Sequence, residues 1–177
     1  RIPPQARHYR FAGLDLGFAY DRGAVIPDGT ERPLADAPVL AARPTTCPGS
    51  RLPHFTGEHG GVTKPLHDAL EPHGFTLLVG PHAAQAWRQA VRTVAATLRM
   101  PVSCLVIGPG GDADFRDGAG AWPAVSEIGR SGGVLVRPDG HVAWRAHDLP
   151  DGPVEALDAA LRRLLSLPDA GRAAETA

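Results

Sequence analysis

Two cysteine thiols are the strongest nucleophiles of this chain, and their surroundings differ. Cys47 opens the segment Cys47-Pro-Gly-Ser50, which has the form of a one-thiol redox motif. A reactive thiol needs a lowered pKa, which a helix N-terminus or a neighbouring cation provides. Cys104 stands inside the apolar run Val102–Ile107, a setting typical of a small core residue. Cys47 is therefore the candidate for thiol chemistry, and its place in the fold decides that question.

A serine motif offers acyl-transfer chemistry. Gly129-Arg-Ser-Gly-Gly133 matches the G-x-S-x-G pattern of hydrolases. Asp139, and then His141 or His147, follow it in the hydrolase order. Such a nucleophile sits between a preceding strand and a following helix. Here the match comes before an apolar strand segment, so it predicts a turn and no hydrolase.

Histidines and glycines raise two further kinds of site. The histidines that lie close together are His54, His59, His67 and His73. They lack the paired spacing of metal ligands, and we interpret them as solvated loop residues. Gly108-Pro-Gly-Gly-Asp-Ala113 resembles a dinucleotide fingerprint, which requires a helix to begin at once. Residues 112–120 carry acids and glycines and predict a loop, which argues against a dinucleotide site.

Hydrophobic periodicity predicts the elements that position these residues. Apolar runs bounded by glycine and proline indicate buried strands, and three-to-four spacing indicates helices. The expected strands are Phe75–Val79, Val102–Ile107, Val134–Val136 and His141–Arg145; the expected helices are Ala83–Arg99, Trp122–Ile128 and one striped by Val154, Leu157, Leu161, Leu164 and Leu165. Asp151 or Gly152 would cap the last helix. Asp15–Tyr20 and Gly23–Ile26 are two short extended candidates upstream.

The order of these elements predicts an α/β fold. The long helix between the first two strands requires a right-handed crossover, so those strands should be parallel. Pro138-Asp139-Gly140 predicts a hairpin that adds two antiparallel strands, with Trp144 in the core. The result is a thioredoxin-like mixed sheet flanked by helices. We expect an irregular N-terminal arm over residues 1–44, the thioredoxin-like domain over 45–167 and a disordered tail over 168–177.

That fold bears on the thiol question. In a thioredoxin fold the reactive cysteine follows the first core strand, where a helix N-terminus lowers its pKa. This place is Gly80–Ala84, which contains no cysteine. Cys47 lies well upstream, so the sequence argues against thiol redox activity.

Composition excludes several classes of protein. The chain has 177 residues with a formal net charge of -1, so it offers no electrostatic attraction for nucleic acid or an anionic membrane. Its apolar runs are too short to span a bilayer, and its polar, proline-broken start is no signal peptide. Two cysteines fit a cytoplasmic protein. Because the chain begins at Arg1 and not at methionine, we expect it to be a piece of a longer polypeptide.

Four stretches, taken in order, resemble the C-terminal region of flavin-dependent aromatic-ring hydroxylases. These are the class A phenol, chlorophenol and aromatic-polyketide hydroxylases. The stretches are Leu14–Tyr20 continuing to Val25-Ile-Pro-Asp-Gly-Thr30, Pro44-Thr-Thr-Cys-Pro-Gly-Ser-Arg-Leu-Pro-His54, Gly74-Phe-Thr-Leu-Leu-Val-Gly80 and Gly133-Val-Leu-Val-Arg-Pro-Asp-Gly-His-Val-Ala-Trp-Arg145.

This resemblance implies a parent enzyme in which an FAD-binding domain precedes this chain. In such enzymes NAD(P)H reduces the flavin, and the flavin hydroperoxide hydroxylates a phenolic ring. The resemblance implies a non-catalytic domain that supports subunit contacts and stability, with no catalytic, cofactor-binding or metal residue of its own. Its expected partners are the preceding FAD and substrate domains and, in a homo-oligomer, a second copy.

Four polar residues in these stretches are candidates for a contact surface: Arg51, His54, Arg137 and His141. An ordinary role in turns and strands accounts for them equally well. Two other functions remain open at this point. One is a free-standing thioredoxin-like accessory protein without redox activity, and the other is a divergent thiol oxidoreductase that uses Cys47. The ring substrate, the choice between NADH and NADPH and the oligomeric state are not encoded in these residues.

Overall fold

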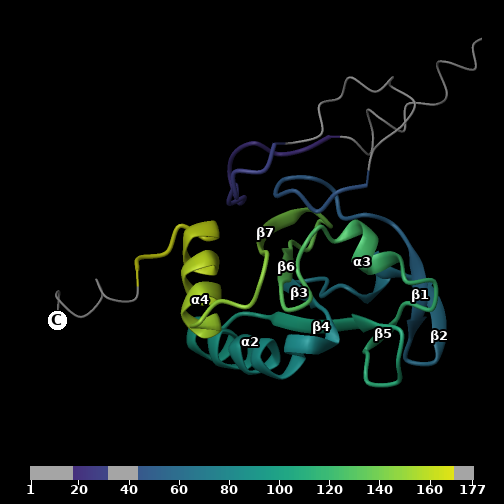
Figure 1. The fold of residues 1–177 in the computed structure, drawn as a ribbon. Coiled ribbons are helices and arrows are strands. Elements are labelled where there is room, and N and C mark those ends of the chain that lie inside the picture. The colour runs from purple at the N-terminus through teal and green to yellow at the C-terminus, as the bar shows by residue number, and fades with distance from the viewer. Residues whose placement is uncertain (1–17, 32–43, 170–177) are drawn as a thin grey trace, which may run out of the picture.

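A mixed sheet of seven strands forms the centre of the molecule (Figure 1). The computed structural model describes residues 18–31 and 44–169. The strands are β1 Thr56–His59, β2 Val62–Pro65, β3 Phe75–Val79, β4 Val102–Gly108, β5 Phe115–Arg116, β6 Gly133–Val136 and β7 Val142–Ala146. The helices are α2 Ala84–Leu98, α3 Ala121–Val125 and α4 Pro153–Leu164, with short 3-10 turns η2 Leu66–Ala69 and η3 Pro81–Ala83. The strands lie side by side in the order β2-β1-β5-β4-β3-β6-β7.

The sheet confirms the predicted α/β, thioredoxin-like arrangement. β3 and β4 are parallel, with Leu77 opposite Cys104, and α2 makes the crossover between them. β6 pairs antiparallel with β3 on its other side, and β7 pairs antiparallel with β6. All five side chains of β3 are buried, as expected for a central strand covered on both faces.

Alternating side chains of the central strands build one core on each face of the sheet. Figure 1 shows α2 and α4 packed together, while α3 lies elsewhere on the molecule. The core beneath α2 and α4 includes Leu77, Val79, Trp87, Leu135 and Leu161. The core on the other face includes Leu78, Ile107, Phe115, Trp122 and Val134. Helices therefore cover both faces, as the order of elements predicts.

The described chain before β1 covers the outer edge of β7 with residues 18–31 and 44–51. We call these residues the arm from here on; they run past residue 44, where the predicted arm ends. Gly49 N–H donates to the carbonyl of Val142 at 2.7 Å, and Val142 N–H donates to the carbonyl of Ser50 at 2.9 Å. Ile26 N–H donates to the carbonyl of Ala143 at 2.8 Å. An exposed strand edge is a template for unwanted pairing, and here the arm supplies its partners.

Some sequence-based expectations are wrong in detail. Residues 112–120 were expected to be loop, yet Phe115–Arg116 form β5. The β1–β2 hairpin was not expected at all. Gly23–Ile26 form no strand, and only Ala19 of the Asp15–Tyr20 candidate makes a bridge, to Ser50. Residues 15–17 lie outside the described part.

The helix ends shift by a few residues. α2 and α4 match their predictions closely, whereas α3 ends at Val125 and not at Ile128. Gly152 is the N-cap of α4, and no side chain caps that end. Most of the predicted tail, residues 170–177, lies outside the described residues, and so does most of the predicted arm.

Among the described helices, none combines the length and the apolar character that crossing a bilayer would require.

Candidate functional site

The four predicted contact residues come together around the β6–β7 hairpin. The backbone of Arg51 forms an antiparallel bridge with that of His141, and Arg137 N–H donates to the carbonyl of His141 at 2.8 Å. The exposed His54 ring stacks on His67, with 6.0 Å between ring centroids. We call Arg51, His54, His67, Arg137 and His141 the hairpin cluster. The pairing of the upstream arm with β7 is what assembles it.

Within the hairpin cluster, two side chains face the arm. The Arg137 guanidinium carbon lies 4.5 Å from the centroid of the Tyr20 ring, and His141 meets the same ring at 4.8 Å between centroids. The side chains of Arg137 and His141 are only 17% and 12% exposed. Phe18, which packs edge-on against Tyr20, is 56% exposed. Of these residues, Arg51, His54 and Phe18 are the exposed ones.

His67 differs from the solvated loop histidine that the sequence suggested. Both of its ring nitrogens are buried, and neither has a hydrogen-bond partner within the described part of the chain. Burial, followed by the charges of Arg51 and His54, lowers the pKa of His67 below its usual value of 6.5. No sequence signal marks this histidine, because its burial depends on the turn at Gly140, which lies against its ring.

Stability should respond to the protonation of His67. Its folded pKa lies below 6.5, so the unfolded chain takes up the proton first and stability falls as the pH drops below that value. We expect His67→Gln to lose less stability than the wild type between about pH 7.5 and about pH 5.5. Urea denaturation at both pH values measures this difference. His73→Gln, at an exposed position, is the control and should lose as much stability as the wild type. The same loss of unfolding free energy in all three proteins would contradict the lowered pKa of His67.

A buried guanidinium joins the arm to β7 and to the loop after α3. The Arg145 side chain is 1% exposed. Its Nε donates to Asp28 at 2.5 Å, and its Nη1 donates to Glu127 at 3.2 Å. Two threonine hydroxyls of the arm complete its contacts, Thr30 at 2.7 Å and Thr46 at 3.1 Å. We call these five residues the Arg145 network.

Asp28, one of the acids of the Arg145 network, has a lowered pKa. Burial acts to raise the pKa of Asp28, but hydrogen bonds from Arg145 and Thr30 outweigh it and lower the pKa from 3.8 to about 2. The contribution of ionised Asp28 to folding stability is therefore complete above pH 3.8, and it is lost as the pH falls through about 2.

We accordingly expect protonation of Asp28 in acid to weaken the contact between the arm and Arg145 of β7. Between about pH 4 and about pH 2, Asp28→Asn should lose less stability than the wild type, although it is less stable at neutral pH. Thermal unfolding across this range measures the effect. Asp21→Asn, which removes an exposed carboxylate, is the matched control. Its thermal stability should fall with pH as steeply as that of the wild type.

Neither cysteine lies at the place of a thioredoxin-like redox centre. Cys47 is 3% exposed in the arm, and its backbone N–H donates to Thr45 Oγ1 at 3.0 Å. Cys104 stands in β4, where burial raises the pKa of its thiol to about 12. The turn η3, which follows β3, contains no cysteine.

Alkylation should be slow at both thiols. At about pH 8, we expect iodoacetamide to modify native Cys104 at least about a hundredfold more slowly than a free thiol, because so little thiolate is present. Cys47 should also react slowly, because its 3% exposure limits contact with the reagent. Rates in denaturing urea give the control, in which both sites should react alike. Rapid labelling of native Cys47 would contradict this expectation and favour the thiol oxidoreductase.

The serine and glycine motifs take structural places. Ser131 precedes β6, and its hydroxyl lies 3.3 Å from Asp148 and accepts the N–H of Leu149 at 3.2 Å. Asp139 and His141 lie at the opposite end of β6, so they form no triad with this serine. No helix begins within residues 108–113. Within residues 18–31 and 44–169, no group of three or more His, Cys, Asp or Glu side chains is arranged to hold a metal ion.

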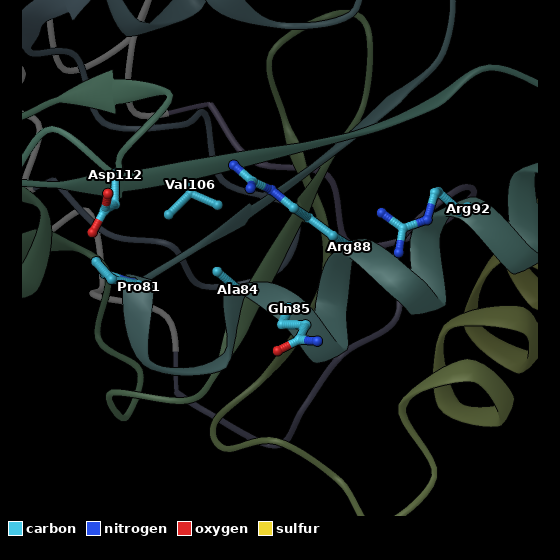
Figure 2. A pocket seen from close by; sticks show the side chains of 7 residues that line it. All are labelled: Pro81, Ala84, Gln85, Arg88, Arg92, Val106 and Asp112. Atoms are coloured by element: carbon cyan, nitrogen blue, oxygen red, sulfur yellow. The ribbon is translucent and has the colours of Figure 1, made fainter.

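A cavity of about 600 Å³ lies between α2 and β4. Figure 2 shows Gln85, Arg88 and Arg92 reaching from one helix, with Val106 and Asp112 across from them. Arg88 binds both oxygens of Asp114 at 2.7 Å, and Asp114 also accepts the N–H of Val106 at 2.9 Å. Arg92 donates to Gln89 at 2.7 Å. Both arginines already have partners on the chain, so this cavity is a poor candidate for an anion site.

Comparisons with known proteins agree on one family. A family model described as the C-terminal region of aromatic-ring hydroxylases matches residues 45–168. Phenol 2-monooxygenase of Pseudomonas sp. strain EST1001 is 37% identical over 146 residues, which cover 82% of this chain and 24% of that protein. Tetracenomycin A2 monooxygenase-dioxygenase of Streptomyces glaucescens is 36% identical over 150 residues, covering 85% of this chain and 25% of that protein.

A solved structure gives the same result at the level of the fold. The flavin-dependent monooxygenase PieE, crystallised with FAD and substrate, superposes with a TM-score of 0.80 at 41% identity. The match covers 90% of this chain and 27% of PieE. The chain thus spans about a quarter of the length of the relatives it matches. With the family model matching 124 residues of the 177, from 45 to 168, this chain belongs to the aromatic-ring hydroxylase C-terminal family.

Proposed function

We propose that this chain is the non-catalytic C-terminal domain of a larger, cytoplasmic flavin-dependent monooxygenase that hydroxylates phenolic or polyketide aromatic rings. FAD and NAD(P)H serve the parent enzyme and bind to its preceding domains. The observation that carries the proposal is the length of the match, which spans most of this chain but only about a quarter of each relative. The relatives include a phenol monooxygenase and a monooxygenase solved with FAD and substrate.

Within that enzyme, the domain stabilises the assembly by its contacts. Arg51, His54 and Phe18 are exposed beside the arm, and Arg137 and His141 hold the arm against the hairpin through Tyr20. Aromatic and arginine side chains are enriched in protein interfaces. We propose that this surface faces the preceding domains of the same polypeptide, or a second copy in a homo-oligomer. Residues 1–44 then serve as the lead-in arm, 45–167 as the domain and 168–177 as the tail.

The mass of the polypeptide in its native source tests this proposal directly. If the chain is a domain of a monooxygenase, intact-protein mass spectrometry should find a mass roughly three and a half times the 18.6 kDa of this chain, because the matched residues are 82% of this chain but only 24% of the relative. A native mass equal to 18.6 kDa would overturn the proposal and leave a free-standing accessory protein.

Flavin binding tests whether FAD belongs to the preceding domains and not to this chain. The full polypeptide should purify with the absorbance of FAD and oxidise NAD(P)H when phenol is added. The 177-residue chain, mixed with FAD under the same conditions, should retain none of it after gel filtration. Stoichiometric FAD on the chain alone would contradict the assignment of the cofactor to the preceding domains.

A further inference from the structure

The short helix α3 depends on contacts outside itself. It has five residues, and a helix of this length is not stable in isolation. Near its start, the buried Trp122 packs in the core on that face of the sheet, and its N–H donates to Asp117 Oδ2 at 2.7 Å. The C-terminal end leaves carbonyl groups that no bond within the helix can satisfy. The partners of that end therefore decide whether it stays in place.

The arm supplies these partners. The hydroxyl of Thr46 donates to the carbonyl of Ser126, which is the C-cap residue of α3. The next residue, Glu127, accepts two donors of the arm at one carboxylate oxygen, the hydroxyl of Thr45 at 2.6 Å and the N–H of Thr46 at 3.2 Å. Arg145 Nη1 donates to the same oxygen at 3.2 Å. Three hydrogen bonds thus join the arm to the end of α3.

Glu127 adopts a backbone conformation that a glutamate disfavours. Its φ is 52°, in the left-handed region that glycine adopts most readily just after a helix. A glycine would fit this backbone but would offer no carboxylate to the arm. Residues in such conformations persist where their surroundings hold them. The hydrogen bonds from Thr45, Thr46 and Arg145 therefore hold Glu127 in place, and with it the chain on either side.

The segment that the arm holds forms part of the wall of a second cavity, of about 510 Å³. Ser126 and Ile128, the neighbours of Glu127, line this cavity together with Trp122 of α3. The turn η3 and the end of β4 also line it. Because residues 126 and 128 belong to the wall, any displacement of the end of α3 changes the cavity directly.

We propose that the arm controls this cavity. While Thr45 and Thr46 hold the end of α3, the wall is fixed; when they release it, residues 126–128 move away and expose the apolar wall at Ile128. The volume lies in the range of small-molecule sites, so the arm governs a space large enough for a ligand. This coupling is a property of the 177-residue chain and is tested on it alone. Only its use by the preceding domains, through the arm, rests on the proposed function.

Hydrogen exchange in Thr46→Val tests the coupling. Valine keeps the shape of threonine but removes the hydroxyl that donates to Ser126. The N–H of Ser126, which donates to the carbonyl of Trp122 at 2.8 Å, should exchange about fivefold or more faster, as the loss of one buried hydrogen bond implies. The amides of β3 should keep their rates. Unchanged exchange at Ser126, or an equal increase in β3, would overturn the proposal.

Thr97→Val is the matched control. Thr97 is exposed on α2, and its hydroxyl donates to the carbonyl of Thr93 within the same helix. The same change of residue type at this position should leave exchange at Ser126 as it is in the wild type. An increase as large as that in Thr46→Val would mean that the effect does not depend on the arm.

Ile128→Cys reports on the cavity itself. Ile128 is half-buried on the wall, so a thiol at this position should react faster with iodoacetamide once the wall moves. Adding Thr46→Val should raise the native rate about fivefold or more, whereas the rates in denaturing urea should be equal. Peptide mapping separates this thiol from Cys47 and Cys104. Equal native rates with and without Thr46→Val would overturn the control of the cavity by the arm.

A double-mutant cycle isolates the carboxylate of Glu127. The hydroxyl of Thr45 reaches the end of α3 through this carboxylate. In the wild type, Thr45→Val should speed exchange at Ser126 about fivefold. In Glu127→Gly, where glycine keeps the left-handed conformation without the side chain, the same change should give a ratio of about one. The same ratio in both backgrounds would contradict the proposed route from the arm to α3.

Discussion

Replacing Arg145 with methionine should lower the free energy of unfolding by about 3–5 kcal/mol. The arginine side chain is 1% exposed, and its removal takes the guanidinium away from the Asp28 carboxylate, which is 11% exposed. Only the exposed ring of His147, at 3.3 Å, then stays beside this carboxylate among the ion-pair partners that the described residues give it. The favourable Coulomb energy is lost, whereas the desolvation of the acid remains. Methionine fills a similar volume, which limits the effect of an empty space. Urea denaturation followed by circular dichroism measures the change.

Arg116→Met is the matched control. Arg116 also pairs with a carboxylate, that of Glu58, but its side chain is 49% exposed. An exposed pair contributes about 1 kcal/mol or less, so this variant should remain close to the wild type. If Arg145→Met loses no more stability than Arg116→Met, the contacts of Arg145 do not contribute to the free energy of unfolding as proposed.

A lysine at position 145 separates charge from geometry. It keeps the positive charge, but a single ammonium cannot reach acceptors that surround the planar guanidinium. Arg145 donates to the arm at both Thr30 and Thr46 and to Glu127 after α3. We therefore expect Arg145→Lys to be intermediate in stability. Hydrogen exchange should show the greatest loss of protection at residues 25–26 and 49–50, where the arm pairs with β7 or with its own neighbours.

The same network shows what sequence reasoning could not find. Arg145 and Asp28 are 117 residues apart in the chain, and Arg145 and Thr46 are 99 apart. No local pattern relates them, and their types alone are compatible with ordinary surface positions. The burial of Arg137 and His141 escaped prediction for the same reason, because the arm residue Tyr20 covers them.

The elements that the sequence did predict are those with a strong local signal. β3 and β4 are apolar runs ended by glycine and proline, and α2 and α4 carry one apolar stripe each. Their pairing then follows from the crossover rule and from the hairpin turn. This local information was sufficient for the parallel pairing of β3 with β4, for the β6–β7 hairpin and for helices on both faces of the sheet.

The strands that were missed are defined by their partners. β1 and β2 are polar four-residue segments without an apolar alternation. One signal was available, since Gly60-Gly61 lies between them and both residues adopt positive φ, as a tight hairpin turn requires. β5 has two residues and exists only through its pairing with β1 and β4. The cavity between α2 and β4 could not be predicted, because it is lined by segments that only the fold brings together.

The second large effect is expected at Trp87, where α2 meets the sheet. This side chain is fully buried in the core beneath α2 and α4, and its indole N–H donates to the carbonyl of Ser131 at 2.9 Å. Trp87→Ala should cost about 3–5 kcal/mol of unfolding free energy, through lost apolar contact and an emptied volume. The carbonyl of Ser131 also loses its donor. Trp87→Phe, which restores much of the ring but not the N–H, should recover a large part of this loss.

Trp144→Ala tests whether burial, and not the residue type, sets the size of the effect. Trp144 packs edge-on against Trp87, with 6.4 Å between ring centroids, but it is only half-buried. Part of its surface is already in contact with water in the folded chain, so its removal should cost clearly less than the removal of Trp87. Thermal and urea unfolding of the two alanine variants give the comparison. A typical domain has a free energy of unfolding of about 5–15 kcal/mol, so Trp87→Ala alone should bring this chain close to unfolding. Equal losses in the two alanine variants would mean that Trp87 is not the main contact between α2 and the sheet.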